Sequence, residues 1–183
     1  MIVSEQEAAD FIHGYTEVMA EIFDPGSHES EMTLLEVLAC GRAKYISDRA
    51  SLDDALGRLE AGSVLIAPEV ESAIRSLEVK QWFYLKDTAT YSVFVDPSAD
   101  TAYAVLGLTE RIRDIVGGTG ALVEVGLVQY HGHYVCDGLV SSVVWLGRNF
   151  RKDLALTFAE IRARGAFRRS CTPTELNKGA FGG

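Results

Sequence analysis

The chain contains few cysteines and prolines. Of its 183 residues only 3 are cysteine and 4 are proline, whereas 48% are apolar. This composition predicts a globular fold with a substantial core and argues against disorder. Cys40, Cys136 and Cys171 are widely spaced and form no C-x-x-C pair, so neither a disulfide framework nor a zinc knuckle is predicted. We expect buried free thiols.

Long apolar runs are also absent. No run approaches the roughly 18 residues that a membrane-spanning helix needs. The first residues, MIVSEQEAADF, lack the basic and apolar regions of a signal peptide. We therefore expect a cytoplasmic protein that does not associate with membranes.

Basic residues are scarce and unevenly distributed. Residues 1–147 hold 9 Lys and Arg against 23 Asp and Glu, whereas residues 148–183 hold 8 against 3. The acidic part disfavours nucleic acid as a partner. The basic segment can neutralise the chain's own acidic surface or stay solvated, which we favour, or it can contact an acidic protein partner. The candidate partner-binding residues in it are Arg162, Arg164, Arg168 and Arg169.

Catalytic signatures and phosphate loops are missing. The chain has no G-x-S-x-G motif and no convincing nucleophile–histidine set. The glycines of VGGTGALVEV, residues 116–125, follow a predicted helix and precede a predicted strand, which is the reverse of the order that a phosphate loop needs. We predict no cofactor, and the sequence favours a protein that is not an enzyme.

The first 78 residues predict a helical region. Capping boxes mark three helix starts, at Ser4 with Glu7, Thr33 with Glu36, and Ser51 with Asp54. A D-P-G sequence at 24–26 ends the first helix, and Pro68 begins a fourth.

From residue 79 the apolar period changes from 3.6 to 2, so residues 79–170 predict strands with one short and one C-terminal helix. Thr109 is the expected cap of the short helix and Asn149 that of the C-terminal helix. Residues 171–183 are expected to form a tail. The predicted fold class is α+β, with N-terminal helices packed on a five-stranded antiparallel sheet that can curl into a barrel-like form.

The stretch VEVGLVQYHGHYVCDGLV, residues 123–140, predicts a β-hairpin. His131-Gly132 suits a two-residue turn, because histidine tolerates positive φ better than most residues and glycine adopts it freely. Tyr130 then lies opposite His133, Leu127 opposite Cys136 and Glu124 opposite Leu139. This register directs Cys136 into the core and places Glu124, His133 and Asp137 together on the other face.

The shared face of Glu124, His133 and Asp137 has three interpretations. Asp137 is a diagonal neighbour of Glu124, so the two carboxylates and the histidine could bind a divalent cation or form a catalytic acid/base pair. We favour the simpler interpretation, a solvated face of the sheet. His131 and His133 flank a turn and have no second ligand pair, so a zinc site is not predicted.

Eight residues between positions 80 and 145 form a further pattern: Tyr91, Asp96, Tyr103, Gly107, Tyr130, Gly132, Asp137 and Gly138. In these residues the chain resembles a group of uncharacterised bacterial proteins, some of which carry a cysteine-rich zinc module called SEC-C. These are mostly turn and core residues, so the resemblance implies a shared fold and no particular activity. The chain lacks the cysteine-rich module.

The sequence therefore leads to one preferred function and two alternatives. We expect a non-catalytic binding or regulatory module that acts on a macromolecular partner, most simply a protein. One alternative is an acidic inhibitor or immunity-type protein that masks a basic partner. The other is a metal-dependent hydrolase that uses Glu124, His133 and Asp137.

Overall fold

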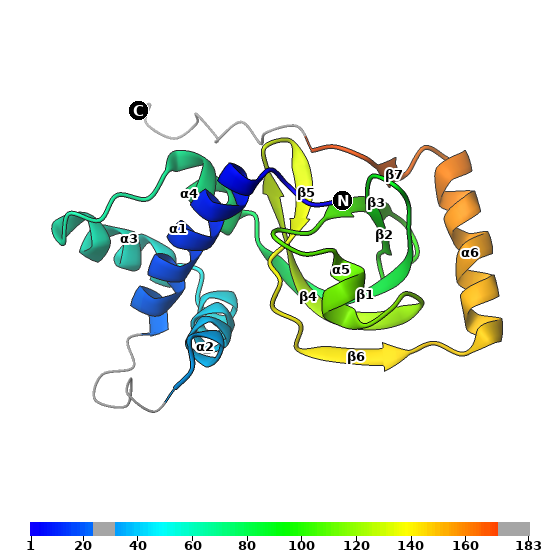
Figure 1. Cartoon of the computed structure of the whole chain (residues 1–183), viewed down its shortest axis with the longest axis horizontal. Helices are drawn as coiled ribbons and strands as arrows, with labels where there is room; N and C mark the ends of the chain where they lie inside the picture. Colours follow the sequence, from blue (N-terminus) through cyan, green and yellow to red (C-terminus); the bar gives the residue numbers. More distant parts are fainter. Residues whose placement is uncertain (24–31, 172–183) are drawn as a thin grey trace, which may run out of the picture.

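The computed structural model describes residues 1–23 and 32–171, and helices come first in it while strands dominate the later part (Figure 1). The helices are α1 Glu5–Phe23, α2 Leu34–Ser47, α3 Ser51–Ala61, α4 Pro68–Arg75, α5 Ile112–Val116 and α6 Arg148–Ala163. The strands are β1 Glu78–Asp87, β2 Ser92–Val95, β3 Ala102–Leu106, β4 Ala121–Tyr130, β5 His133–Cys136, β6 Ser142–Trp145 and β7 Phe167–Arg168.

The first two helices begin with the capping boxes that the sequence predicts. Ser4 N–H donates to Glu7 Oε2 over 2.9 Å, and Thr33 N–H donates to Glu36 Oε2 over 2.7 Å. The third predicted box, at Ser51, is wrong: Asp48 accepts the Ala50 N–H, and Ser51 Oγ donates to the carbonyl of Asp48. The expected helix end at 24–26 lies outside the described residues.

Five strands close into a ring in the order β1, β2, β3, β5, β4 and back to β1. All neighbouring pairs in the ring are antiparallel except β3 and β5, which are parallel. The predicted α+β fold with its largely antiparallel sheet is confirmed. Two strands lie outside the ring: β6 pairs with β4, and β7 pairs with β3.

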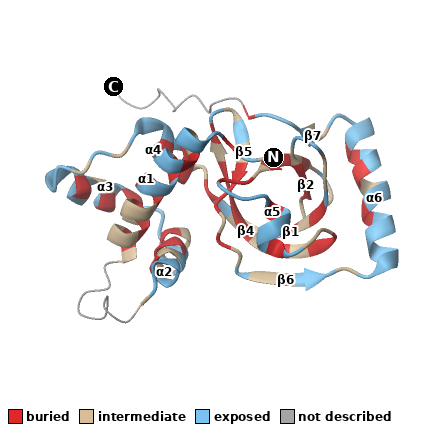
Figure 2. Ribbon diagram, in the orientation of Figure 1, coloured by how far each residue is buried: buried red, intermediate tan, exposed pale blue. Residues whose placement is uncertain are grey.

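The ring separates the apolar side chains into clusters. One fills its interior and includes Trp82, Tyr84 and Cys136. A second joins α1, α2, α3 and α4 to the outer face of the β4–β5 hairpin, where it includes Val128 and Tyr130. A third lies under α6. The hairpin is consequently buried on both faces, as the red segments of β4 and β5 in Figure 2 show.

Two helix starts differ from the prediction. Arg111, not Thr109, is the cap of α5, and Gly147, not Asn149, is the cap of α6. Gly117 closes α5 with φ of 89°, a conformation that glycine adopts without strain. In the ranges that the structure describes, no helix has the length and apolar character to cross a membrane.

Candidate functional site

The predicted hairpin turn is present. His131 and Gly132 have φ of 47° and 78°, and Tyr130 and Leu127 pair with His133 and Cys136 as expected. The register differs after Asp137. Gly138 takes φ of 80°, the chain leaves the hairpin, and Glu124 pairs with Ser142 of β6 instead of Leu139.

The three candidate site residues consequently have different environments. His133 is exposed, Glu124 is half-buried, and the Asp137 side chain has no exposed surface. The predicted solvated face is wrong for Asp137, because the N-terminal helices cover that side of the hairpin. In residues 1–23 and 32–171, no group of three or more His, Cys, Asp or Glu side chains could hold a metal ion. The hydrolase hypothesis gains no support from this geometry.

Asp137 is the centre of a buried polar network between the helices and the ring. Arg42 Nη1, from α2, donates to Asp137 Oδ2 over 2.8 Å, and the Tyr15 hydroxyl, from α1, donates to the same oxygen over 3.4 Å. Oδ1 accepts the backbone N–H groups of Gly126 and Leu139, each over 3.1 Å. Both carboxylate oxygens are therefore occupied.

Arg42 completes this junction with two further hydrogen bonds. Its guanidinium donates to the Leu139 carbonyl and to Ser141 Oγ, each over 2.7 Å. Burial raises the pKa of the Asp137 carboxyl, and Arg42 with the backbone N–H groups acts against that rise. This arrangement fixes the helices to the sheet and offers no carboxylate to a substrate.

The sequence analysis did not identify Arg42, although the glycine before it, Gly41, indicates a close helix contact. A Cβ at Gly41 would lie 2.1 Å from the carbonyl oxygen of Met19, so glycine lets α2 approach α1 closely. A glycine inside a predicted helix indicates such an approach. It does not identify the partner of the next residue.

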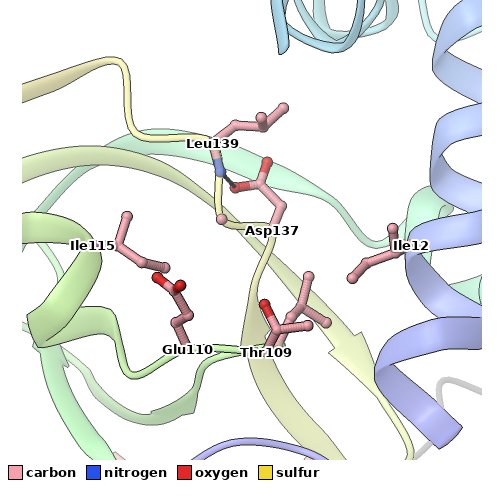
Figure 3. Close-up of a pocket in the computed structure, with 8 residues that line it drawn as sticks. Ile12, Thr109, Glu110, Ile115, Asp137 and Leu139 are labelled. Carbon is pink, nitrogen blue, oxygen red and sulfur yellow. Dashed lines mark hydrogen bonds between the residues drawn. The ribbon is translucent and has the colours of Figure 1, made fainter. Parts of the chain in front are cut away.

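A pocket of about 300 Å³ opens beside the Asp137 junction (Figure 3). Ile12 of α1 faces it from one side, and Thr109, Glu110 and Ile115 line the other. Leu139 also lines it and lies next to the Asp137 carboxylate, with its side chain pointing away from Glu110 and Ile115 in this view. The pocket combines aliphatic walls with acidic groups.

A second feature is the edge of the sheet at β6. Within residues 1–23 and 32–171, β6 pairs with β4 alone, which leaves its other edge free. Exposed apolar side chains gather along it: Val144 is 57% exposed, Trp145 55% and Phe150 47%. Trp145 packs against Gly118, where an added Cβ would lie 3.1 Å from its ring. The Phe150 ring lies 5.4 Å from that of Phe83. We call Val144, Trp145 and Phe150 the edge patch.

The four predicted partner-binding arginines lie at the C-terminal end of α6 or just after it, at the end that is distant from β6 (Figure 1). All four are exposed. Arg164 donates to the carbonyls of Ala99 and Asp100 over 2.7 Å each. Arg162 and Arg169 lie over the rings of Phe158 and Phe167, at 5.9 and 5.5 Å from the ring centres. Arg168 is in the short strand β7. Its side chain also hydrogen-bonds that of Tyr134, so all four contact their own chain, and their role in partner binding stays a prediction.

Comparisons with known proteins add no assignment: no family model, no curated protein and no solved structure matches the chain. The resemblance to the bacterial group with SEC-C modules stays a prediction.

Proposed function

We propose that this chain is a non-catalytic binding module that takes up an extended, acidic segment of a protein partner along β6. The observation that carries the proposal is that exposed apolar side chains, and basic residues at the start of α6, lie beside an edge of β6 that no described strand covers. An extended peptide can add to such an edge as a further strand.

The backbone of β6 has groups available for this pairing. In an antiparallel pair, successive residues direct their N–H and C=O groups alternately toward the neighbour and away from it. Leu146 N–H donates to the Gly120 carbonyl, and Trp145 and Val143 stand opposite Ala121 and Val123. By this alternation, Val143 and Trp145 direct their backbone groups to the free side.

The edge patch supplies apolar contact on both faces of the strand. Val144 and Trp145 are successive residues, so their side chains project to opposite faces. An added strand would contact both. Tryptophan and arginine are the residues that most often dominate protein interfaces, and Gly118 already supports the Trp145 ring.

The charged residues that follow β6, at the start of α6, favour an acidic partner. Residues 142–152 contain the cations Arg148, Arg151 and Lys152 and no acidic residue. Arg151 packs at the start of β4, because a Cβ at Gly120 would lie 2.5 Å from its Cδ. Since β6 has 4 residues, strand pairing alone provides few hydrogen bonds, and the aromatic and charged contacts must provide the rest.

Selection from a random peptide library tests the proposal. We expect the selected peptides to be acidic with alternating apolar residues, and to bind less tightly as salt rises. Trp145→Ala should weaken a selected peptide by at least about tenfold, as expected for a central interface residue. Leu65→Ala is the matched control, because Leu65 is 80% exposed between α3 and α4 and should leave affinity unchanged.

Charge reversal distinguishes the two basic surfaces. Arg148→Glu with Arg151→Glu should abolish peptide binding, whereas reversal at Arg162, Arg164, Arg168 and Arg169 should have a smaller effect. Selection of basic peptides that bind independently of Trp145 would refute the proposal and favour the acidic inhibitor instead. Full retention of affinity in Trp145→Ala would also refute it.

A further inference from the structure

The pocket at the junction of the helices and the ring lies outside the proposed β6 interface. Three separate segments form its walls: α1 contributes Ile12, the segment from β3 to α5 contributes Leu108, Glu110 and Ile115, and the chain after β5 contributes Leu139. A volume of about 300 Å³ is at the lower end of the range for small-molecule sites.

The walls are aliphatic. Leu108 and Leu139 both line the pocket and are buried, at 8% and 7% exposure. Ile12 and Ile115 are 40% and 38% exposed and stand at the rim, on either side of the pocket in Figure 3. Exposed isoleucines that flank a hollow favour an aliphatic occupant, since it would remove their surface from water.

The charged groups of the pocket are both acidic, and they differ in availability. Asp137 is already bound by Arg42 and by two backbone N–H groups. Glu110 has no side-chain hydrogen bond or ion pair within the described part of the chain. Its carboxylate points into the space that the labelled residues enclose, next to Ile115 (Figure 3). Arg111, the next residue, does not line the pocket.

We propose that this pocket binds a small molecule with a primary ammonium group on an aliphatic chain. The ammonium pairs with Glu110 at the rim, and the chain lies between Ile12 and Ile115 and reaches Leu108 and Leu139. The Arg42–Asp137 junction holds the walls in place and makes no ion pair with the ligand.

A homologous series of n-alkylammonium ions, titrated into the full chain and followed by amide chemical shifts, tests this proposal. We expect the largest shifts at Gly138, Leu139 and Ile115, and affinity that rises about fourfold with each added methylene until the pocket is full, from the burial of one methylene. The matching n-alkyl alcohols should bind about fivefold more weakly, because they lack the charge-assisted hydrogen bond.

Two charge-neutralising variants locate the ammonium contact. Glu110→Gln should weaken ammonium binding about fivefold, to the level of the alcohol, without changing alcohol binding. Asp114→Asn removes the same charge from an exposed position on α5 that does not line the pocket, and should leave both unchanged. Because both residues are exposed, their replacement should not affect folding.

Several results would overturn the proposal. Equal affinities for the ammonium ions and the alcohols would show that Glu110 makes no ion pair with the ligand. If Asp114→Asn weakened ammonium binding as much as Glu110→Gln, the effect would come from general surface charge. Shifts confined to residues outside the pocket, or no shifts with any member of the series, would mean that the hollow is not a ligand site. None of these results depends on whether β6 binds a peptide.

Discussion

Arg42 should be among the most important polar residues for stability, although nothing in the sequence singles it out. We consider Arg42→Met, which keeps an unbranched side chain and removes the guanidinium. The substitution removes hydrogen bonds to Asp137, Leu139 and Ser141 and leaves the fully buried Asp137 carboxylate without its counter-charge.

The structure allows the cost to be estimated. Removing one partner of a buried ion pair costs about 3–5 kcal/mol, because the remaining charge is left uncompensated. A typical domain is stable by about 5–15 kcal/mol, so the loss is a large fraction of the total. Arg75, whose guanidinium contacts Asp53 and Glu71 at the surface, is the control: Arg75→Met should cost less than about 1 kcal/mol.

Urea unfolding followed by circular dichroism measures both variants. With a slope of about 2–3 kcal/mol/M, the midpoint of Arg42→Met should fall by about 1–2.5 M. The double variant with Asp137→Asn should lose less stability than the sum of the two single variants, because either substitution alone already breaks the Arg42–Asp137 ion pair. A loss below about 1 kcal/mol in Arg42→Met, or full additivity in the double variant, would refute our description of the junction.

Three further predictions concern other parts of the chain. Gly126→Ala should destabilise the protein by about 1–3 kcal/mol in urea unfolding, because the new Cβ would lie 2.3 Å from Asp137 Oδ2. Gly57→Ala is the control: its new Cβ would meet no atom of the described residues within 4 Å, and it should stabilise α3 by up to about 1 kcal/mol. Similar effects of the two substitutions on stability would contradict the packing at Gly126. Burial raises the pKa of Cys136 to about 12, so its thiol should react with a disulfide reagent near pH 8 only after unfolding, and rapid labelling of the native protein would contradict its burial. Hydrogen bonds with Ser4 lower the pKa of Glu7 below its ordinary value of 4.5. The stability that ionised Glu7 contributes is therefore complete above pH 4.5 and is lost as the pH falls through the lowered pKa. Glu7→Gln should flatten the pH dependence of the free energy of unfolding below pH 4.5, and an unchanged curve would contradict the contact.

The features that the sequence predicts correctly depend on neighbouring residues. The Ser4–Glu7 box and the His131-Gly132 turn each depend on groups within three positions, and both are present. The Ser51 box fails for an equally local reason. The helix begins at Ser51 itself, with Ala50 as its cap, and the Ser51 hydroxyl donates to the Asp48 carbonyl instead of accepting a backbone N–H from the first turn.

The main error in the candidate site has a long-range cause. Alternation correctly places Asp137 on the face opposite Cys136, but alternation says nothing about what covers that face. Its partner Arg42 is 95 residues away in the chain, on a helix whose position depends on packing against α1. The same limit applies to Glu124. The sequence predicts that the hairpin continues and pairs Glu124 with Leu139, whereas the structure pairs it with Ser142 of the separate strand β6.

The most direct test of the proposed function is amide hydrogen exchange along β6, measured with and without a selected acidic peptide. We predict that the N–H groups of Val143 and Trp145, which face the free edge, exchange much more slowly in the complex, while those of α3 do not change. Protection that is absent from β6 and present elsewhere on the chain would contradict strand addition at this edge.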